Sequence, residues 1–249
     1  MLFLIDALTR LLNHWFAAPI VALMTKLGIH VAHPSHPINN ALTMELIVMT
    51  LLLLFFTAAR LSLDIEKPGA IQHTAEFIHD FVSNQADQVI GHGYERYVPF
   101  VTTILLFVLA CNLFGLLPGF ETPTADPVAP LGIAILTFIY YNWNGVREQG
   151  LFKYVKHFAG PIWWIAWLMF PIEIISHLAR IMSLTIRLFA NMLASDLITL
   201  VAFSLIPVLV PVLGLGLHFA VSLIQAYIFM LLAMIYLSQA VSHEDEASI

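Results

Sequence analysis

Long uncharged apolar stretches, separated by short polar segments, predict a chain of membrane-spanning helices. The clearest stretch is 42–63, in which Glu45 and Arg60 stand near the two edges and no charged residue lies between them. A helix crosses the hydrocarbon core of a bilayer, about 30 Å thick, with about 20 apolar residues. This stretch therefore has the length and the hydropathy of one complete span.

Two more spans are predicted on either side of a turn. The first covers about 97–117 and has Pro99 in its first turn, where the missing N–H leaves no helical hydrogen bond unmade. The stretch 112–130 is rich in Gly and Pro and predicts the turn. A further span then follows from about 130 to 145.

The last two apolar stretches are too long to stand upright in a bilayer. Residues 161–203 would form a helix of roughly 65 Å, and residues 207–240 one of roughly 50 Å. Each must tilt steeply or bend in a hydrocarbon core of about 30 Å. The prolines that mark the expected ends and kinks are Pro161, Pro171, Pro207 and Pro211.

Two segments have amphipathic patterns. In 71–92 an apolar stripe lies opposite acidic residues, which predicts a helix on the membrane surface. Its histidines are expected to contact water at the interface rather than a metal ion. Residues 1–29 carry polar residues at four-residue intervals, so we expect an interfacial helix, with a first span as the alternative. The polar residues of that N-terminal face are Asp6, Arg10 and His14, with Thr9 and Asn13 beside them.

Composition supports a membrane location for the whole chain. Of its 249 residues 60% are hydrophobic and 10% charged, whereas soluble domains have roughly 45–50% and 25%. One soluble core could not bury so much apolar surface, so the surplus must face lipid. We therefore predict an all-α integral membrane protein with about five membrane-embedded helices, the last two long and strongly tilted, plus amphipathic interfacial helices. Residues 1–40 are expected to form an N-terminal interfacial segment and 41–249 a single membrane-embedded domain.

The distribution of Lys and Arg predicts the orientation, because cytoplasmic loops carry an excess of both. The connection 119–130 contains Glu121 and Asp126 but no basic residue, so we expect it outside. Five crossings then place the N-terminus outside and the C-terminus in the cytoplasm. The basic residues of the two loops expected in the cytoplasm are Arg60, Lys67 and Arg96, and Arg147, Lys153 and Lys156.

A row of polar residues runs along one face of the long predicted helix 161–203. An arginine at the centre of a membrane helix costs about 2.5–3.5 kcal/mol, so this face must contact water or a partner's carboxylate. The residues spaced three or four apart on it are Glu173, Ser176, His177, Arg180, Ser183, Arg187, Asn191 and Ser195. The last helix adds His218, Ser222 and Gln225 on one face.

Arg187 has no acidic partner within its own helix. Asp196 lies nine residues further along, on the opposite side, and Glu173 is about four turns away. We therefore expect another subunit to supply the partner. Two roles stay open for Arg180. It has a function in the site, or it is an interfacial arginine whose guanidinium extends to the lipid headgroups. Simple hydrogen bonding between helices is the expected role of Ser183, Thr185, Ser195 and Ser222 taken singly.

The residues of these helices are similar to the signature of subunit a of the F-type ATP synthase. The matching segments are SLTIRLFANMLASDLI (183–198) and HFAVSLIQAYIFMLLAMIYLS (218–238), and upstream NLFGLLPGFETPT (112–124), PGAIQHTAEFI (68–78) and Tyr97-Val98-Pro99. The resemblance covers about residues 40–240, and RLFANM is its most specific part. In this family the two long helices lie nearly flat around a rotating ring of c subunits, which agrees with the length argument.

The resemblance implies roles for individual residues. Arg187 matches the essential arginine that faces the carboxylate of the c-ring, and Asn191 matches the polar residue one turn away. Asp196 stands at the place of an acidic residue in the half-channel open to the outside, where bacterial relatives carry Glu. The remaining matches are His218 to the relay histidine, Gln225 to the glutamine beside the arginine, and Glu173 to an acidic residue near the cytoplasmic half-channel. Secondary channel-lining residues are Ser176, His177, Ser183 and Ser222.

The expected function is that of a non-catalytic stator without cofactor or metal. Protons, rather than Na⁺, would enter by the outer half-channel, neutralise a c-ring carboxylate and leave by the inner one, while Arg187 blocks a short circuit. The expected partners are the c-ring, a b-type peripheral-stalk subunit, the remaining ATP synthase subunits and the lipid bilayer, with no nucleic acid. A bacterial inner membrane is favoured because the N-terminus lacks the pattern of a transit peptide.

Two other functions stay open at this point. A secondary ion-coupled transporter commonly shows internal repeats, whereas the two halves of this chain differ. A structural scaffold would leave Arg187 unexplained.

Labelling of single cysteines from each side of the membrane tests the orientation. We expect Ala125→Cys to react with an impermeant reagent added outside, because its loop carries no basic residue. Cysteines at 60–67 and 147–156 should react only from the cytoplasmic side. Labelling of Ala125→Cys from the cytoplasm alone would contradict the predicted topology.

Overall fold

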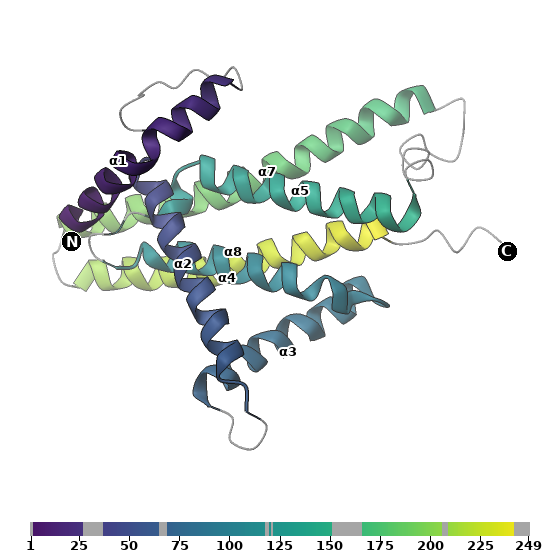
Figure 1. The fold of residues 1–249 in the computed structure, drawn as a ribbon, viewed down its shortest axis with the longest axis horizontal. Coiled ribbons are helices and arrows are strands. Elements are labelled where there is room, and N and C mark those ends of the chain that lie inside the picture. The colour runs from purple at the N-terminus through teal and green to yellow at the C-terminus, as the bar shows by residue number, and fades with distance from the viewer. Residues whose placement is uncertain are drawn as a thin grey trace. The chain divides into compact units, whose positions relative to one another are not determined.

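The computed structural model describes residues 2–26, 37–64, 69–117, 120, 122–150, 166–205 and 209–241, and within them the chain is helical, without strands. The α-helices in chain order are α1 (Leu2–Lys26), α2 (Asn40–Leu61), α3 (Ala70–Ile90), α4 (Val98–Phe114), α5 (Val128–Gln149), α7 (Ala166–Leu205) and α8 (Leu209–Val241) (Figure 1). Two short 3-10 helices, η1 (Tyr94–Arg96) and η2 (Pro123–Ala125), precede α4 and α5.

The prediction of an all-α membrane protein is confirmed. In the described part of the chain, three helices are long and apolar enough to cross a membrane, within Asn40–Leu61, Trp167–Val201 and Val212–Val241, and α4 is a shorter apolar helix of 17 residues. The predicted span of about 130–145 is observed as α5 with 22 residues. Its last turns are more polar than those of the other spans.

The exceptional length of the last two helices is also confirmed. α7 has 40 residues and α8 has 33, which corresponds to roughly 60 Å and 50 Å. Neither can stand along the normal of a core about 30 Å thick. α7 continues through Pro171, so this proline does not end the helix. Pro161 and Pro207, the other expected ends, lie outside the described residues.

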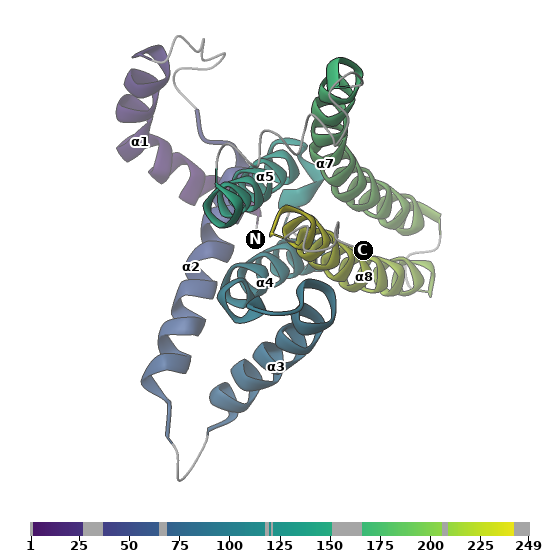
Figure 2. The same cartoon turned by 90° about the vertical axis from the view of Figure 1, so that its right-hand side faces the viewer.

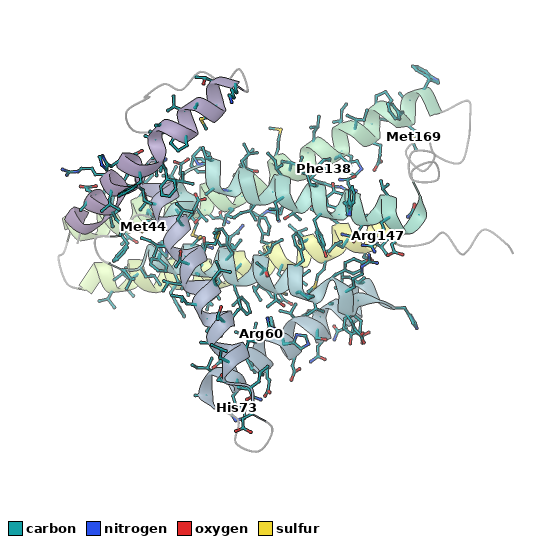
Figure 3. The ribbon with its side chains drawn as sticks, in the orientation of Figure 1. Met44, Arg60, His73, Phe138, Arg147 and Met169 are labelled. Atoms are coloured by element: carbon teal, nitrogen blue, oxygen red, sulfur yellow. The ribbon has the colours of Figure 1, made fainter. Side chains whose placement is uncertain are left out.

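The chain divides into two compact units, and the first comprises residues 1–55, 107–129 and 189–223. Met44, labelled in Figure 3, is fully buried in it. A set of hydrogen bonds joins α1 to the start of α2 in this unit. Thr9 Oγ1 lies 2.9 Å from Thr43 Oγ1, and the side-chain amide of Asn13 both donates to and accepts from the backbone of Ile38.

The polar face of α1 therefore differs in part from the expectation of a helix that turns its polar residues to water. Thr9 and Asn13 are buried against α2, and Asp6 accepts a hydrogen bond from Asn40, whereas Arg10 is exposed. Buried polar groups need hydrogen-bond partners, and the start of α2 supplies them. Half of this polar face is thus a contact between helices.

The second unit comprises residues 56–106, 130–188 and 224–249, and α3 lies in it alongside α8 (Figures 1 and 2). The predicted helix is observed as α3, and within its apolar stripe Val82 is fully buried, like the nearby Ala86, whereas Phe77 is 73% exposed. Tyr227 of α8 packs against Phe81 of α3. α3 thus turns one apolar side to the protein and leaves another available to lipid.

Candidate functional site

Polar residues of α7 and α8 meet in the first unit. Ser195 and Asp196 are neighbours on α7, and His218 lies on the first half of α8. Ser195 and His218 are buried, at 4% and 1% exposure. We call these residues, together with Asn112 at the end of α4 and Thr122 before η2, the Asp196–His218 cluster.

His218 has a polar partner on each ring nitrogen. Nε2 lies 3.0 Å from the backbone carbonyl oxygen of Asn112, and Nδ1 lies 2.7 Å from Ser195 Oγ and 3.2 Å from Asp196 Oδ1. Because a carbonyl can only accept hydrogen bonds, Nε2 carries a hydrogen whether the ring is neutral or charged. Gain and loss of a proton are therefore confined to Nδ1, the nitrogen that faces Ser195 and Asp196.

Asp196 connects this buried ring to a more accessible position, because its side chain is 32% exposed. Thr122 Oγ1 donates a hydrogen bond of 3.1 Å to its Oδ1. The Ser195 hydroxyl can donate to an unprotonated Nδ1, and a protonated Nδ1 can donate to Ser195 Oγ or to the Asp196 carboxylate. Nδ1 therefore keeps a hydrogen-bond partner in both charge states of the ring.

Two residues that the sequence analysis did not select hold this cluster together. Asn112 is fully buried, and its Oδ1 accepts a hydrogen bond of 2.6 Å from Thr124. Gly115 lies so close to Thr122 and His218 that a Cβ would stand 1.9 Å from Thr122 Oγ1. A side chain at 115 would occupy the place of that hydroxyl.

The second unit holds another histidine between two polar groups. The ring of His177 lies with Nδ1 2.8 Å from the hydroxyl of Tyr141 on α5 and with Nε2 3.5 Å from Glu173 Oε1. Tyr141 is 2% exposed and His177 9%, whereas the Glu173 side chain is 37% exposed. Phe138, labelled in Figure 3, packs edge-on against the same ring. We call Tyr141, Glu173 and His177 the Glu173–His177 cluster.

Arg180 lies beside this cluster and against an aromatic ring. Its guanidinium carbon is 5.1 Å from the centre of the Tyr236 ring, and that ring packs against Tyr141. A guanidinium over a tyrosine face is a favourable cation–π arrangement. The sequence left open whether Arg180 has a functional role or reaches the lipid headgroups. In the structure its guanidinium contacts an aromatic ring within the protein.

Arg187 is half-buried in the middle of α7, and its Nη2 donates a hydrogen bond of 3.3 Å to Ser183 Oγ one turn earlier. Among the described residues, no Asp or Glu side chain forms an ion pair with Arg187. The acidic residues Asp196 and Glu173 of the same helix lie instead beside His218 and His177. The Arg187 guanidinium can still donate several more hydrogen bonds.

The other predicted residues are placed as follows. Ser222 is buried and donates to the backbone carbonyl of His218 within α8, and Gln225 is 2% exposed. Ser176 is half-buried on α7, whereas Ser183 and Asn191 are exposed on the same helix as Arg187. The structure thus brings Asp196 together with His218, and Glu173 together with His177.

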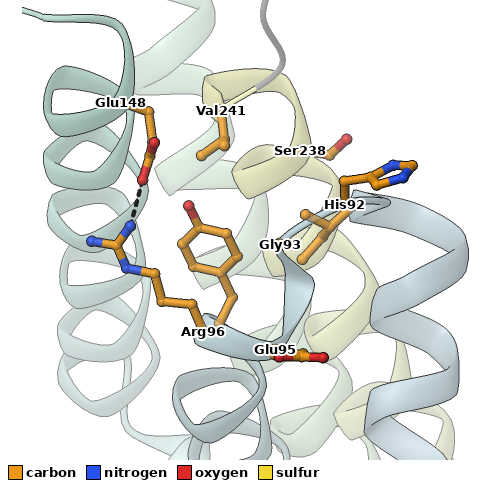
Figure 4. Close-up of a pocket in the computed structure, with 9 residues that line it drawn as sticks. His92, Gly93, Glu95, Arg96, Glu148, Ser238 and Val241 are labelled. Atoms are coloured by element: carbon orange, nitrogen blue, oxygen red, sulfur yellow. Dashed lines mark hydrogen bonds and ion pairs between the residues drawn. The ribbon is translucent and has the colours of Figure 1, made fainter.

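The second unit also has a cavity of about 510 Å³, and none of the predicted proton-translocation residues lines it. Figure 4 shows Arg96 and Glu148 paired at its edge, and Tyr97 is among the residues that line it. Gln149 of α5 also donates to the carbonyl of Ala240 near this cavity. The bond between Gln149 and Ala240 joins the ends of α5 and α8, so the contacts around this cavity have a structural role.

Some missed residues had a signal in the sequence and others had none. Asn112 and Thr122 lie in the segment NLFGLLPGFETPT, so the motif could have pointed to them. Tyr141 and Tyr236 stand in apolar stretches, where aromatic residues are common and carry no specific signal. Only the packing of α5 against α7 reveals the contact of Tyr141 with His177.

Comparisons with known proteins agree on one family. Residues 42–238 match the family described as ATP synthase A chain. The chain is 53% identical over 235 residues to "ATP synthase subunit a" of Koribacter versatilis (strain Ellin345), covering 94% of this chain and 96% of the relative. It is 47% identical over 213 residues to the protein of the same name from Solibacter usitatus (strain Ellin6076), covering 86% and 91%. For Helicobacter pylori (strain P12) the identity is 41% over 209 residues, covering 83% and 92%.

Gly115→Ala tests the close packing of the Asp196–His218 cluster. The added Cβ would lie 1.9 Å from Thr122 Oγ1 and 3.0 Å from His218 Cε1, so Thr122 would have to leave Asp196. We expect a loss of roughly 1–3 kcal/mol in stability, measured as a lower Tm of the purified protein in detergent.

The matched control is Gly132→Ala on α5, where a Cβ meets open space. Alanine favours a helix over glycine, so this variant should keep or raise the Tm. An unchanged Tm in Gly115→Ala would contradict the packing described for the cluster.

Proposed function

The chain belongs to the ATP synthase A chain family, and from this premise we propose that it is the proton-conducting stator subunit of an F-type ATP synthase. In this role two aqueous half-channels in the protein lead protons to and from a ring of c subunits. Proton flow turns the ring and drives ATP synthesis elsewhere in the complex. The chain itself makes and breaks no covalent bond to a substrate.

The observation that carries this proposal is the position of Arg187. It lies within a helix stretch long and apolar enough to cross a membrane, and among the described residues it has no carboxylate partner. A charge at that depth is expensive unless a partner or water compensates it. A carboxylate on the passing c-ring would supply the opposite charge, and Arg187 would favour its ionised form.

The geometry of the Asp196–His218 cluster is an argument for an outer half-channel at this place. A partly exposed carboxylate lies next to a buried imidazole whose Nδ1 alone exchanges a proton. A proton can therefore move from the accessible Asp196 to His218 and onward to the ring. Once neutralised, the ring carboxylate can rotate through lipid, because a neutral acid costs far less there than a charged one.

The geometry of the Glu173–His177 cluster is an argument for an inner half-channel at this place. Its geometry repeats the arrangement of a partly exposed carboxylate beside a buried histidine. Between the two steps, Arg187 acts as a fixed positive charge that keeps protons from passing directly between the half-channels. Asn191 and Gln225 are proposed to line the path near this arginine.

The remaining assignments belong to the same proposal. The partners are the c-ring, a b-type peripheral-stalk subunit and the other subunits of the complex, and the transported ion is H⁺ rather than Na⁺. The chain lies in a bacterial inner membrane with its N-terminus outside and its C-terminus in the cytoplasm. Residues 1–40 form an N-terminal segment attached to a membrane domain over 41–249.

Loss of either member of the outer pair should slow proton flux. In vesicles that carry the full complex, we expect Asp196→Ala or His218→Ala to reduce ATP-driven proton pumping roughly tenfold or more, with assembly intact. Thr199→Val is the control, because among the described residues its hydroxyl donates to the Ser195 backbone carbonyl within α7 and to no side chain of the cluster. Near-normal flux in both relay variants would place the outer path elsewhere.

Replacement of Arg187 should separate coupling from leakage. Arg187→Ala is expected to abolish both ATP-driven pumping and proton-driven ATP synthesis, and to permit passive proton leak because the positive barrier is gone. Arg187→Lys keeps the charge but not the planar fork, so it should reduce the leak while coupling stays poor. Both are measured as proton flux in vesicles with and without ATP.

Arg180→Ala is the matched control for this experiment. It removes an arginine two turns away on the same helix, one that Tyr236 holds within the protein. We expect much weaker effects on pumping and no leak. ATP synthesis that survives in Arg187→Ala would overturn the proposed function.

A further inference from the structure

We propose that Tyr141 is a positioning residue of the inner half-channel, which holds His177 in the orientation that exchanges a proton with Glu173. This inference rests on the proposed function. It adds a residue of α5 to a site whose other members lie on α7. The observation behind it is the 2.8 Å contact between the Tyr141 hydroxyl and His177 Nδ1.

The two ring nitrogens of His177 have different kinds of partner. Nε2 faces Glu173, so the proton that the ring exchanges with this carboxylate is the one on Nε2. Nδ1 faces a hydroxyl, which can either donate or accept. When Nε2 has given up its proton, the neutral ring carries its hydrogen on Nδ1, so Nδ1–H donates to the Tyr141 oxygen in both charge states of the ring.

Tyr141 can therefore stay bonded to His177 in both charge states of the ring. Without an acceptor at this place, the buried Nδ1–H would be unpaired, and the neutral ring would keep its hydrogen on Nε2, where it could not accept a proton from Glu173. The hydroxyl is buried along with the ring, so water would not readily take its place. This property suits a histidine that must change its charge in every transport step.

Aromatic packing also restricts the orientation of the His177 ring. The Tyr141 and His177 rings are nearly parallel, with centroids 5.9 Å apart and an angle of 18°, and Phe138 contacts the His177 ring edge-on at 5.9 Å. Rotation of the imidazole about its side-chain bond would disturb both contacts. Nε2 therefore remains directed at the partly exposed Glu173 carboxylate.

The charged and titratable groups around His177 come from three helices. On α7 these are Glu173 and Arg180, which carry opposite charges. α5 contributes Tyr141, and α8 contributes Tyr236, which packs on Tyr141 and lies under Arg180. The nearest of these to Nδ1 is the Tyr141 hydroxyl.

The test compares Tyr141→Phe with Tyr140→Phe in vesicles that carry the full complex with its ATP-binding side outward. The rate of ATP-driven pumping is measured while the pH is varied separately in the bath, which meets the inner half-channel, and in the lumen. Tyr140 is the matched control, because it is the adjacent residue on α5 and its ring stacks on Phe100. Each change removes one hydroxyl and leaves the ring.

We expect Tyr141→Phe to lower the pumping rate roughly three- to tenfold and to change its dependence on bath pH, with the dependence on lumen pH unchanged. Glu173→Gln should change the same dependence, because it alters the other partner of the ring. In a His177→Gln background Tyr141→Phe should add little, since both substitutions then act on one unit. Tyr140→Phe should match the wild type.

Three outcomes would overturn the inference. They are a wild-type bath-pH profile in Tyr141→Phe, a change in the lumen-pH profile, and an effect that adds fully to that of His177→Gln. If any of these occurs while Arg187→Ala is uncoupled as expected, Tyr141 has no such role and the proposed function stands. If Arg187→Ala remains coupled, the proposed function itself fails.

Discussion

A positive charge inside a membrane helix needs a compensating partner, and the account of this protein depends on that constraint. Arg187 lies in a helix of 40 residues that is far too long to cross a bilayer upright. Its hydrogen bond to Ser183 on the same helix does not neutralise it. In the described part of the chain no carboxylate pairs with it, so the charge is available to a group outside the chain.

The two histidine clusters follow one chemical rule. In each, a carboxylate of α7 lies beside a buried ring, at 3.2 Å for Asp196 with His218 and 3.5 Å for Glu173 with His177. They differ in which nitrogen meets the carboxylate. The backbone carbonyl of Asn112 fixes the hydrogen of His218 on Nε2 and leaves Nδ1 to exchange, whereas the Tyr141 hydroxyl leaves Nε2 of His177 directed at Glu173.

The sequence predicted the helices and most members of these clusters, because long apolar stretches and polar residues inside them are visible without a structure. Asp196 and His218 could be selected since charged or titratable residues are rare at such positions. The contacts of Thr122 and Tyr141 could not, because they depend on how separate helices pack. The burial of Thr9 and Asn13 was missed for the same reason, since a polar helix face looks alike whether it meets water or another polar face.

A disulfide cross-link tests most directly whether the Arg187 face of α7 meets a ring carboxylate. Single cysteines at Ser183 and Asn191, which are exposed on the same helix, would be introduced together with Cys111→Ala. A second cysteine would be placed one turn from the carboxylate of the c subunit in the assembled complex. We predict cross-links from both positions, and none from Leu184, whose side chain is buried within the protein. Cross-links from Leu184 alone, or none from 183 and 191, would contradict the account.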